Sequence, residues 1–117
     1  MASNFEFQSK FIKSQQFYEA GVSLIEAGYF RQATVMFWIA ARDRMFGWLE
    51  KRSISYNDTI SALTLVMSNV GSDDARAAVV DLYTLGVMAE WDETIFVSES
   101  NATRYKKTTE DLIAILN

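Results

Sequence analysis

The chain contains no proline in its 117 residues. Proline breaks helices, because its ring removes a backbone hydrogen bond and clashes with the preceding turn. A chain of this length without proline can therefore form long, uninterrupted helices. Apolar residues recur at helical spacing through most of the sequence, and only the β-branched stretch 94–97 has the character of a strand. The sequence thus predicts an all-α domain.

Apolar spacing and helix-terminating residues together predict five helices. Gly28 lies where the first helical pattern ends, and glycine suits the left-handed residue that follows a helix. Ser3 or Asn4 is the expected N-cap of the first helix, Asn57 that of the third and Ser72 that of the fourth. The expected ranges are 5–27, 29–51, 58–70, 73–97 and 102–116. Two antiparallel pairs and a short helix are typical of a four- to five-helix up-and-down bundle.

Nothing in the sequence divides it into parts. It has no low-complexity segment or linker, and its length and 50% hydrophobic content fit one domain with one core, residues 1–117. The longest strongly apolar stretch without charge, 33–41, is far shorter than the roughly 20 residues that cross a bilayer. The first residues lack the basic and apolar segments of a signal peptide. We therefore expect a single cytoplasmic domain with no membrane contact.

Histidine and cysteine are absent as well. Catalytic triads with histidine, thiolate nucleophiles, and metal sites built on imidazole or thiolate are therefore excluded. The closest acidic cluster, Glu90, Asp92 and Glu93, contains residue types that hold Mg²⁺, but no glycine-rich phosphate loop accompanies it. A solvated helix face is the simpler interpretation. We expect no catalytic residue, no cofactor and no metal site, and hence no enzyme.

Glu93 falls on the apolar side of the predicted helix 73–97. A carboxylate in apolar surroundings needs a partner, because burying an unpaired charge is costly. Arg42 and Arg44 of the predicted helix 29–51 are the candidates. We predict a structural ion pair between Glu93 and one of these two arginines.

Basic and aromatic residues are interleaved toward the end of the predicted helix 29–51. Such a pattern can bind single-stranded nucleic acid by stacking and charge. The basic residues do not share one face, however, and residues 53–117 carry only four Lys or Arg against ten Asp or Glu. RNA or nucleotide binding, by a degenerate ribonuclease for example, is therefore the alternative function. The basic residues concerned are Arg42, Arg44, Lys51 and Arg52.

Residues 20–33 read Ala-Gly-Val-Ser-Leu-Ile-Glu-Ala-Gly-Tyr-Phe-Arg-Gln-Ala, and residues 37–41 read Phe-Trp-Ile-Ala-Ala. This segment resembles the first helical hairpin of the HEPN family, in which a Leu-x-x-Gly-Tyr turn precedes an alanine and a helix of aromatic and small residues. The later order of a short, a long and a C-terminal helix is similar too. The same Gly-Tyr-x-x-Ala pattern occurs in tetratricopeptide repeats, but the chain shows no self-similarity at a period of about 34 residues.

The resemblance implies an all-α bundle that pairs as a homodimer. Many HEPN domains are RNA-cleaving toxins of toxin–antitoxin and anti-phage systems, and others are non-catalytic partners of small nucleotidyltransferases. The nuclease members carry an Arg followed a few residues later by a His, whereas the corresponding region here, 88–93, reads Met-Ala-Glu-Trp-Asp-Glu. The resemblance therefore favours a non-catalytic interaction or regulatory domain of a defence module, with a nucleotidyltransferase or a toxin as its partner.

Two predicted helices, 29–51 and 73–97, carry more apolar surface than one core needs. On helix 73–97 one apolar side includes Leu82, Ala89 and Phe96 and is expected to face the core. If the second side were exposed, it would be too apolar for a stable monomer. We predict that it forms an interface, either isologous in a homodimer or with another protein. The predicted interface residues are Val80, Val87, Trp91, Ile95, Val35 and Phe46.

Overall fold

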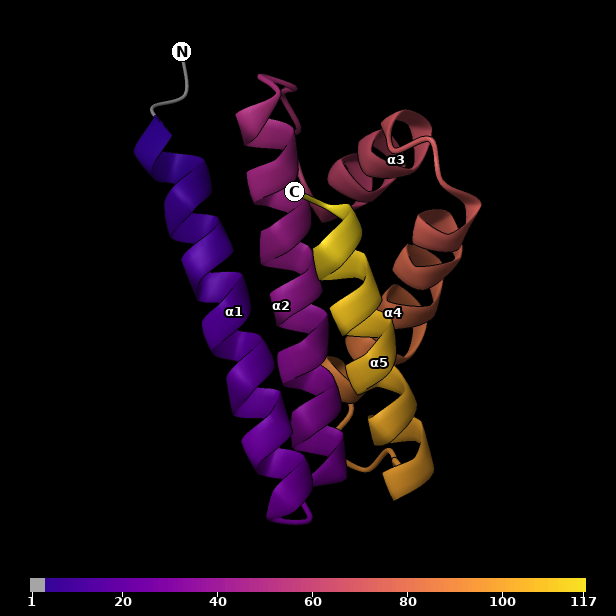
Figure 1. Cartoon of the computed structure of the whole chain (residues 1–117). Coiled ribbons are helices and arrows are strands. Elements are labelled where there is room, and N and C mark those ends of the chain that lie inside the picture. Colours follow the sequence, from indigo (N-terminus) through magenta and orange to yellow (C-terminus); the bar gives the residue numbers. More distant parts are fainter. Residues whose placement is uncertain (1–3) are drawn as a thin grey trace.

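The computed structural model describes residues 4–117, and side chains from residue 7 onward. Its helices are α1 (Asn4–Glu26), α2 (Phe30–Lys51), α3 (Thr59–Asn69), α4 (Asp73–Trp91) and α5 (Glu99–Ile115). The predicted all-α helical bundle is confirmed (Figure 1). The possible cap at Ser3 lies outside the described residues. None of the described helices combines the length and apolarity needed to cross a membrane.

Helices α1 and α2 form a long antiparallel hairpin (Figure 1). Gly28 closes the turn with a φ of 85°, as predicted, and the amide of Tyr29 donates to the carbonyl of Leu24 at 2.8 Å. Such a bond over the end of a helix satisfies carbonyls that have no partner within the helix. The turn residues that the sequence predicts thus set the direction of α2.

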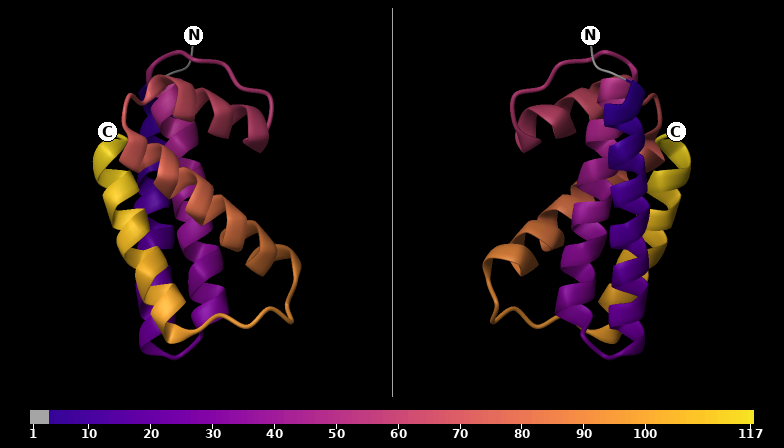
Figure 2. Two further views of the ribbon diagram at one scale, coloured as in Figure 1. Left: turned by 90° about the vertical axis from the view of Figure 1, so that its right-hand side faces the viewer. Right: turned by 90° about the vertical axis from the view of Figure 1, so that its left-hand side faces the viewer.

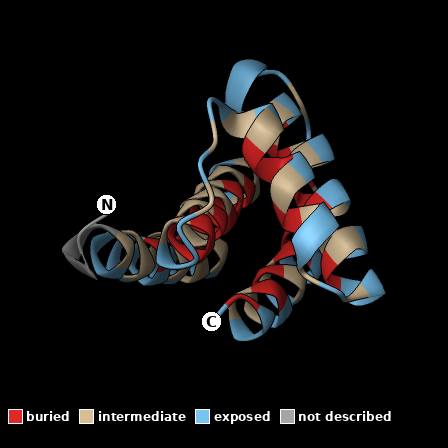
Figure 3. Cartoon of the chain, turned by 90° about the horizontal axis from the view of Figure 1, so that it is seen from above, coloured by how far each residue is buried: buried red, intermediate tan, exposed pale blue. Residues whose placement is uncertain are grey.

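Helix α2 is the centre of the bundle, since it contacts each of the other four helices. Helix α3 lies across one end of the molecule, α4 runs obliquely past α2, and α5 returns alongside both (Figures 1 and 2). Buried residues lie where helices face one another, and exposed residues lie outside (Figure 3). The two apolar sides of α2 are therefore both used within the chain. The largest fully buried side chains of α2 are Phe37, Trp38, Met45 and Leu49.

Polar caps begin the three later helices. Ser72 caps α4, as predicted, by accepting a hydrogen bond from the amide of Ala75 at 3.1 Å. The cap of α3 is Asp58 rather than Asn57, because Asp58 and Ser61 form a reciprocal capping box. In such a box each side chain bonds the other residue's amide, which satisfies two donors that the helix leaves free.

Helix α4 ends at Trp91, six residues before the predicted end at 97. Asp92 is extended, with φ −125° and ψ 103°, and its side chain accepts hydrogen bonds from the amide of Thr94 at 2.9 Å and from its hydroxyl at 2.6 Å. Aspartate competes with helical bonding in this way, and β-branched residues follow. The prediction that Phe96 faces the core is therefore wrong: Phe96 is 87% exposed.

Candidate interaction surface

An apolar stripe runs along the outward side of α4. The side of α4 that faces the bundle holds its buried residues, among them Val79, Leu82 and Gly86. On the opposite side, Val80 is 53%, Met88 51% and Trp91 81% exposed. Large exposed apolar groups that gather on one face indicate a contact surface, whereas single ones are ordinary. We call this set the α4 stripe: Ala77, Val80, Thr84, Val87, Met88 and Trp91.

Close packing on α2 fixes the position of the stripe. Gly86 lies directly on Trp38, and a Cβ at position 86 would be only 2.4 Å from the Cβ of Trp38. The indole Nε1 of Trp38 donates to Glu90 at 3.1 Å, and Arg31 donates to the carbonyl of Ala89 at 2.7 Å. These contacts hold the C-terminal end of α4 against α2. The outer side of α4 therefore faces away from α2 in one orientation.

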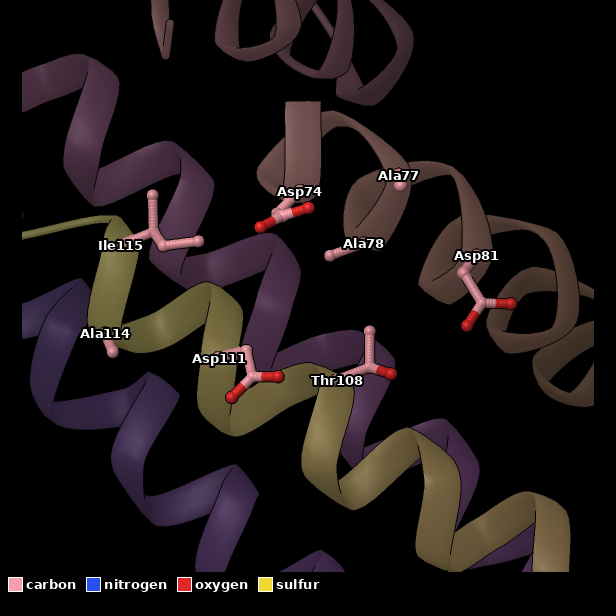
Figure 4. A pocket seen from close by; sticks show the side chains of 8 residues that line it. All are labelled: Asp74, Ala77, Ala78, Asp81, Thr108, Asp111, Ala114 and Ile115. Atoms are coloured by element: carbon pink, nitrogen blue, oxygen red, sulfur yellow. The ribbon is translucent and has the colours of Figure 1, made fainter. Parts of the chain in front are cut away.

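An open groove of about 660 Å³ lies beside the stripe, between α4 and α5. Both helices contribute carboxylates and small alanine side chains to its lining (Figure 4). Arg104 and the hydroxyl of Tyr105 bond Asp81, and Lys107 donates to Asp111 at 2.9 Å. Burial, together with the charge of Asp81, raises the pKa of Tyr105. The lining residues of this α4–α5 groove are Asp74, Ala77, Ala78, Asp81, Thr108, Asp111, Ala114 and Ile115.

Over the residues that the structure describes, no group of three or more acidic side chains is placed to hold a metal ion. The cluster of Glu90, Asp92 and Glu93 is dispersed. Glu90 faces Trp38, Asp92 bonds Thr94, and Glu93 is exposed beyond the end of the helix. The bonds from Thr94 also hold the pKa of Asp92 below its ordinary value.

The structure does not bring Glu93 to either of its predicted partners. Arg42 pairs with Glu90 at 4.0 Å, and Arg44 donates to the carbonyl of Leu116 at 2.8 Å. The reason is the early end of α4: Glu93 follows the helix instead of lying on its apolar side, so it is exposed and needs no buried partner. The carboxylate of α4 that does pair with Arg42, Glu90, lies one turn earlier in the chain than Glu93.

Among the predicted interface residues, Val80 and Trp91 are exposed on the α4 stripe. Val87 is half-buried at the edge of the stripe, and Ile95 is half-buried in the loop after α4.

The two predicted interface residues on α2, Val35 and Phe46, are half-buried. Phe46 stacks on Tyr56 with ring centroids 4.8 Å apart, and so packs within its own chain. The interface itself stays a prediction.

The basic residues of α2 are mostly engaged within the chain. Arg44 lies 3.9 Å above the ring of Phe11, and Arg52 lies 4.0 Å from that of Trp48 and donates to the carbonyl of Asn117 at 3.2 Å. Arginines that bond the last carbonyls of a helix stabilise its end. Arg44 and Arg52 therefore attach the end of α5 to α2, rather than forming one open basic face.

A polar cluster that the sequence did not reveal joins α1, α2 and the following loop. The ammonium of Lys10 bonds Glu50 and lies 3.1 Å from the hydroxyl of Tyr56, which donates to Glu50 at 2.9 Å. Burial raises the pKa of Tyr56. Burial opposes the charge of Lys10, but the bonds to Glu50 and Tyr56 prevail and raise its pKa. No spacing rule finds this cluster, because 40 residues separate Lys10 from Glu50.

No protein-family model matches the chain, and no curated protein matches it either. The resemblance to HEPN domains therefore stays a prediction.

Proposed function

We propose that this chain is a protein-interaction domain that binds its partner through the α4 stripe, and that it acts by binding rather than by catalysis. One observation carries the proposal: Val80, Met88 and Trp91 share the outward face of α4 and are 53%, 51% and 81% exposed, and Phe96 in the loop that follows is 87% exposed. Aromatic side chains dominate the energetics of interfaces, because they bury much apolar area at little cost in conformational entropy.

The way α4 is held also supports binding. Its inner face is fixed by the contact of Gly86 with Trp38 and by the bond from Arg31 to Ala89. A surface that is ordered before it binds loses less conformational entropy on association. The stripe thus has the rigidity that a specific interface needs.

The resemblance of residues 20–41 to the HEPN hairpin agrees with this proposal. Non-catalytic members of that family act through other proteins, and this chain lacks the histidine of the nuclease motif. Within the proposal, the chain is a regulatory component of a toxin–antitoxin or anti-phage module. This part rests on analogy with the family.

Replacing Trp91 with glutamate tests the proposal, because it puts a charge at the most exposed aromatic of the stripe. Gln16→Glu, which makes the same charge change on an exposed position of α1, is the matched control. The readouts are mass by light scattering at several concentrations and the proteins retained from a lysate of cells that express the chain. We expect the wild type and Gln16→Glu to retain the same partner or assembly, and Trp91→Glu to lose it.

Circular dichroism separates binding from folding. Trp91 ends α4 and is largely exposed, so its replacement should leave the helical signal unchanged. Identical mass and partners for the wild type and Trp91→Glu would contradict the proposal. A salt-sensitive shift of single-stranded RNA by the wild-type chain would favour the nucleic-acid alternative instead, because phosphate contacts release counterions.

A further inference from the structure

The α4 stripe carries no charge of its own, but its surroundings are acidic. Residues 73–97 contain one arginine against six carboxylates. That arginine, Arg76, is already engaged, since it donates to Asp73 at 2.6 Å and to the carbonyl of Met67 at 3.1 Å. A partner that covers the stripe therefore meets apolar groups in the middle and negative charge around them. The carboxylates near the stripe are Asp73, Asp74, Asp81, Asp92 and Glu93, whereas Glu90 faces Trp38 and Arg42 of α2.

The α4–α5 groove extends this acidic edge. Asp74 and Asp81 lie on the α4 wall together with Ala77 and Ala78, and Asp111 lies on the α5 wall together with Ala114 (Figure 4). The groove has room for a long side chain, whose methylenes would lie on the alanines while its cationic end reaches the carboxylates. Lysine and arginine divide their contacts in this way. The cations that Asp81 and Asp111 bond, Arg104 and Lys107, are exposed residues of the same chain, which a partner's cation can replace. The hydroxyl of the buried Tyr105 also donates to Asp81.

A second copy of the chain fits this surface poorly. Acidic pairs stand at both ends of the stripe, Asp73 and Asp74 before it and Asp92 and Glu93 after it. Two stripes packed antiparallel would bring the first pair of each copy to the second pair of the other, and parallel packing would bring each pair to its own equivalent. Both arrangements juxtapose like charges, which disfavours the pairing.

We infer that the occupant of the α4 stripe is an amphipathic helix of a different protein, apolar on the side that meets the stripe and basic along the edge over the α4–α5 groove. This inference rests on the proposed function and names its partner by chemistry. From Ala77 to Trp91 the stripe is about 21 Å long at 1.5 Å per residue, so it matches four turns of such a helix.

Two synthetic helical peptides test the inference. Both have about 18 residues and the same leucine face, and their remaining positions are lysine in one and glutamate in the other. Binding is measured by calorimetry with the wild-type chain, with Trp91→Glu, and with the double variant Asp74→Asn, Asp111→Asn. The control double variant, Glu19→Gln with Glu26→Gln, changes the net charge equally on exposed positions of α1, a helix without contacts to α4.

The inference requires the lysine peptide to bind and the glutamate peptide not to bind. The double variant Asp74→Asn, Asp111→Asn should bind the lysine peptide about five- to tenfold more weakly than the wild type, which is the sum of two exposed charge contacts. The control double variant should bind it as tightly as the wild type does. Trp91→Glu should abolish binding, and about 0.5 M salt should weaken it, because salt screens exposed charges.

Other outcomes separate the inference from the proposed function. In one such outcome both peptides bind equally and Trp91→Glu binds neither; in another the wild-type chain is a homodimer that Trp91→Glu dissociates. Either outcome supports the α4 stripe as an interaction surface but contradicts the inference that its partner is basic. If Trp91→Glu binds the lysine peptide as tightly as the wild type does, the peptide is attracted by net charge alone. That result would contradict the α4 stripe as its docking site. Failure of both peptides to bind overturns the inference, and the partner assay with Trp91→Glu then decides the proposed function by itself.

Discussion

A methyl group at position 86 would collide with the core at the crossing of α2 and α4. The added Cβ of Gly86→Ala would lie 2.4 Å from the Cβ of Trp38 and 2.7 Å from its Cγ. Carbon atoms in favourable contact are about 3.5–4.0 Å apart. Trp38 is 1% exposed and bonds Glu90 through its indole nitrogen, so it has no free space to move into.

The size of the effect follows from which atoms collide. They lie at the root of the Trp38 side chain, where the backbone of α2 sets their position, so rotating the ring cannot separate them. Overpacking of a core costs about 1–3 kcal/mol, and a collision this close belongs at the upper end, near 3 kcal/mol. Alanine is the better helix former by about 1 kcal/mol. The free energy of unfolding should therefore fall by about 2 kcal/mol, or about 8 °C in Tm at this chain length.

Urea denaturation and thermal melting, both followed by circular dichroism, measure this change. Thr84→Ala is the control, since Thr84 is exposed on the same helix and its replacement should stay within about 0.5 kcal/mol of the wild type. If Gly86→Ala proved as stable as the wild type, α4 would not cross α2 at Trp38, and the orientation of the α4 stripe would have to be revised.

Three further changes test other parts of the structure. Asp58→Ala removes the cap of α3 and should lower the free energy of unfolding by about 1 kcal/mol in urea denaturation. Ser14→Ala removes the buried hydroxyl that donates to the carbonyl of Ala40 at 2.7 Å, and should cost about 0.5–1.5 kcal/mol in the same assay. Burial and the hydrogen bond to Glu110 raise the pKa of Tyr18 to about 12 from its ordinary value of 10.0, so the folded chain keeps a proton that the unfolded chain loses. Stability should therefore fall as the pH rises from 10 to 12, and a Tyr18→Phe variant with an undiminished fall would refute this assignment.

Much of the secondary structure follows from the sequence, because helices and turns depend on neighbours within about four residues. The left-handed Gly28 and the cap at Ser72 were both predicted from residue type and spacing alone. The predicted helix ends are wrong where two local signals for the start or end of a helix compete. At Asn57 and Asp58 both side chains can cap, and only the pairing with Ser61 selects Asp58. At Asp92, apolar spacing continues past a residue whose side chain ends the helix.

The candidate surface was predictable only in part. Periodicity places Val80 and Trp91 together on a second side of the fourth helix, and the structure leaves both exposed there. Periodicity also extends that helix too far, and it therefore wrongly predicts Phe96 in the core and Glu93 in a buried ion pair. The α4–α5 groove has no signal in the sequence, because Asp81 and Asp111 come to line the same groove only when α5 returns alongside α4.

The sequence by itself determined that this chain is helical, that a turn lies at Gly28, and that histidine and thiol chemistry are excluded. Only the tertiary structure decided which apolar side faces solvent and which charges meet. Three helical glycines show the reason. Gly21, Gly47 and Gly86 look like weak points of their helices, yet each lies against an aromatic side chain of a neighbouring helix, Phe37, Phe11 and Trp38 respectively. Contacts of that kind join residues far apart in the chain, so packing decides them and local spacing does not.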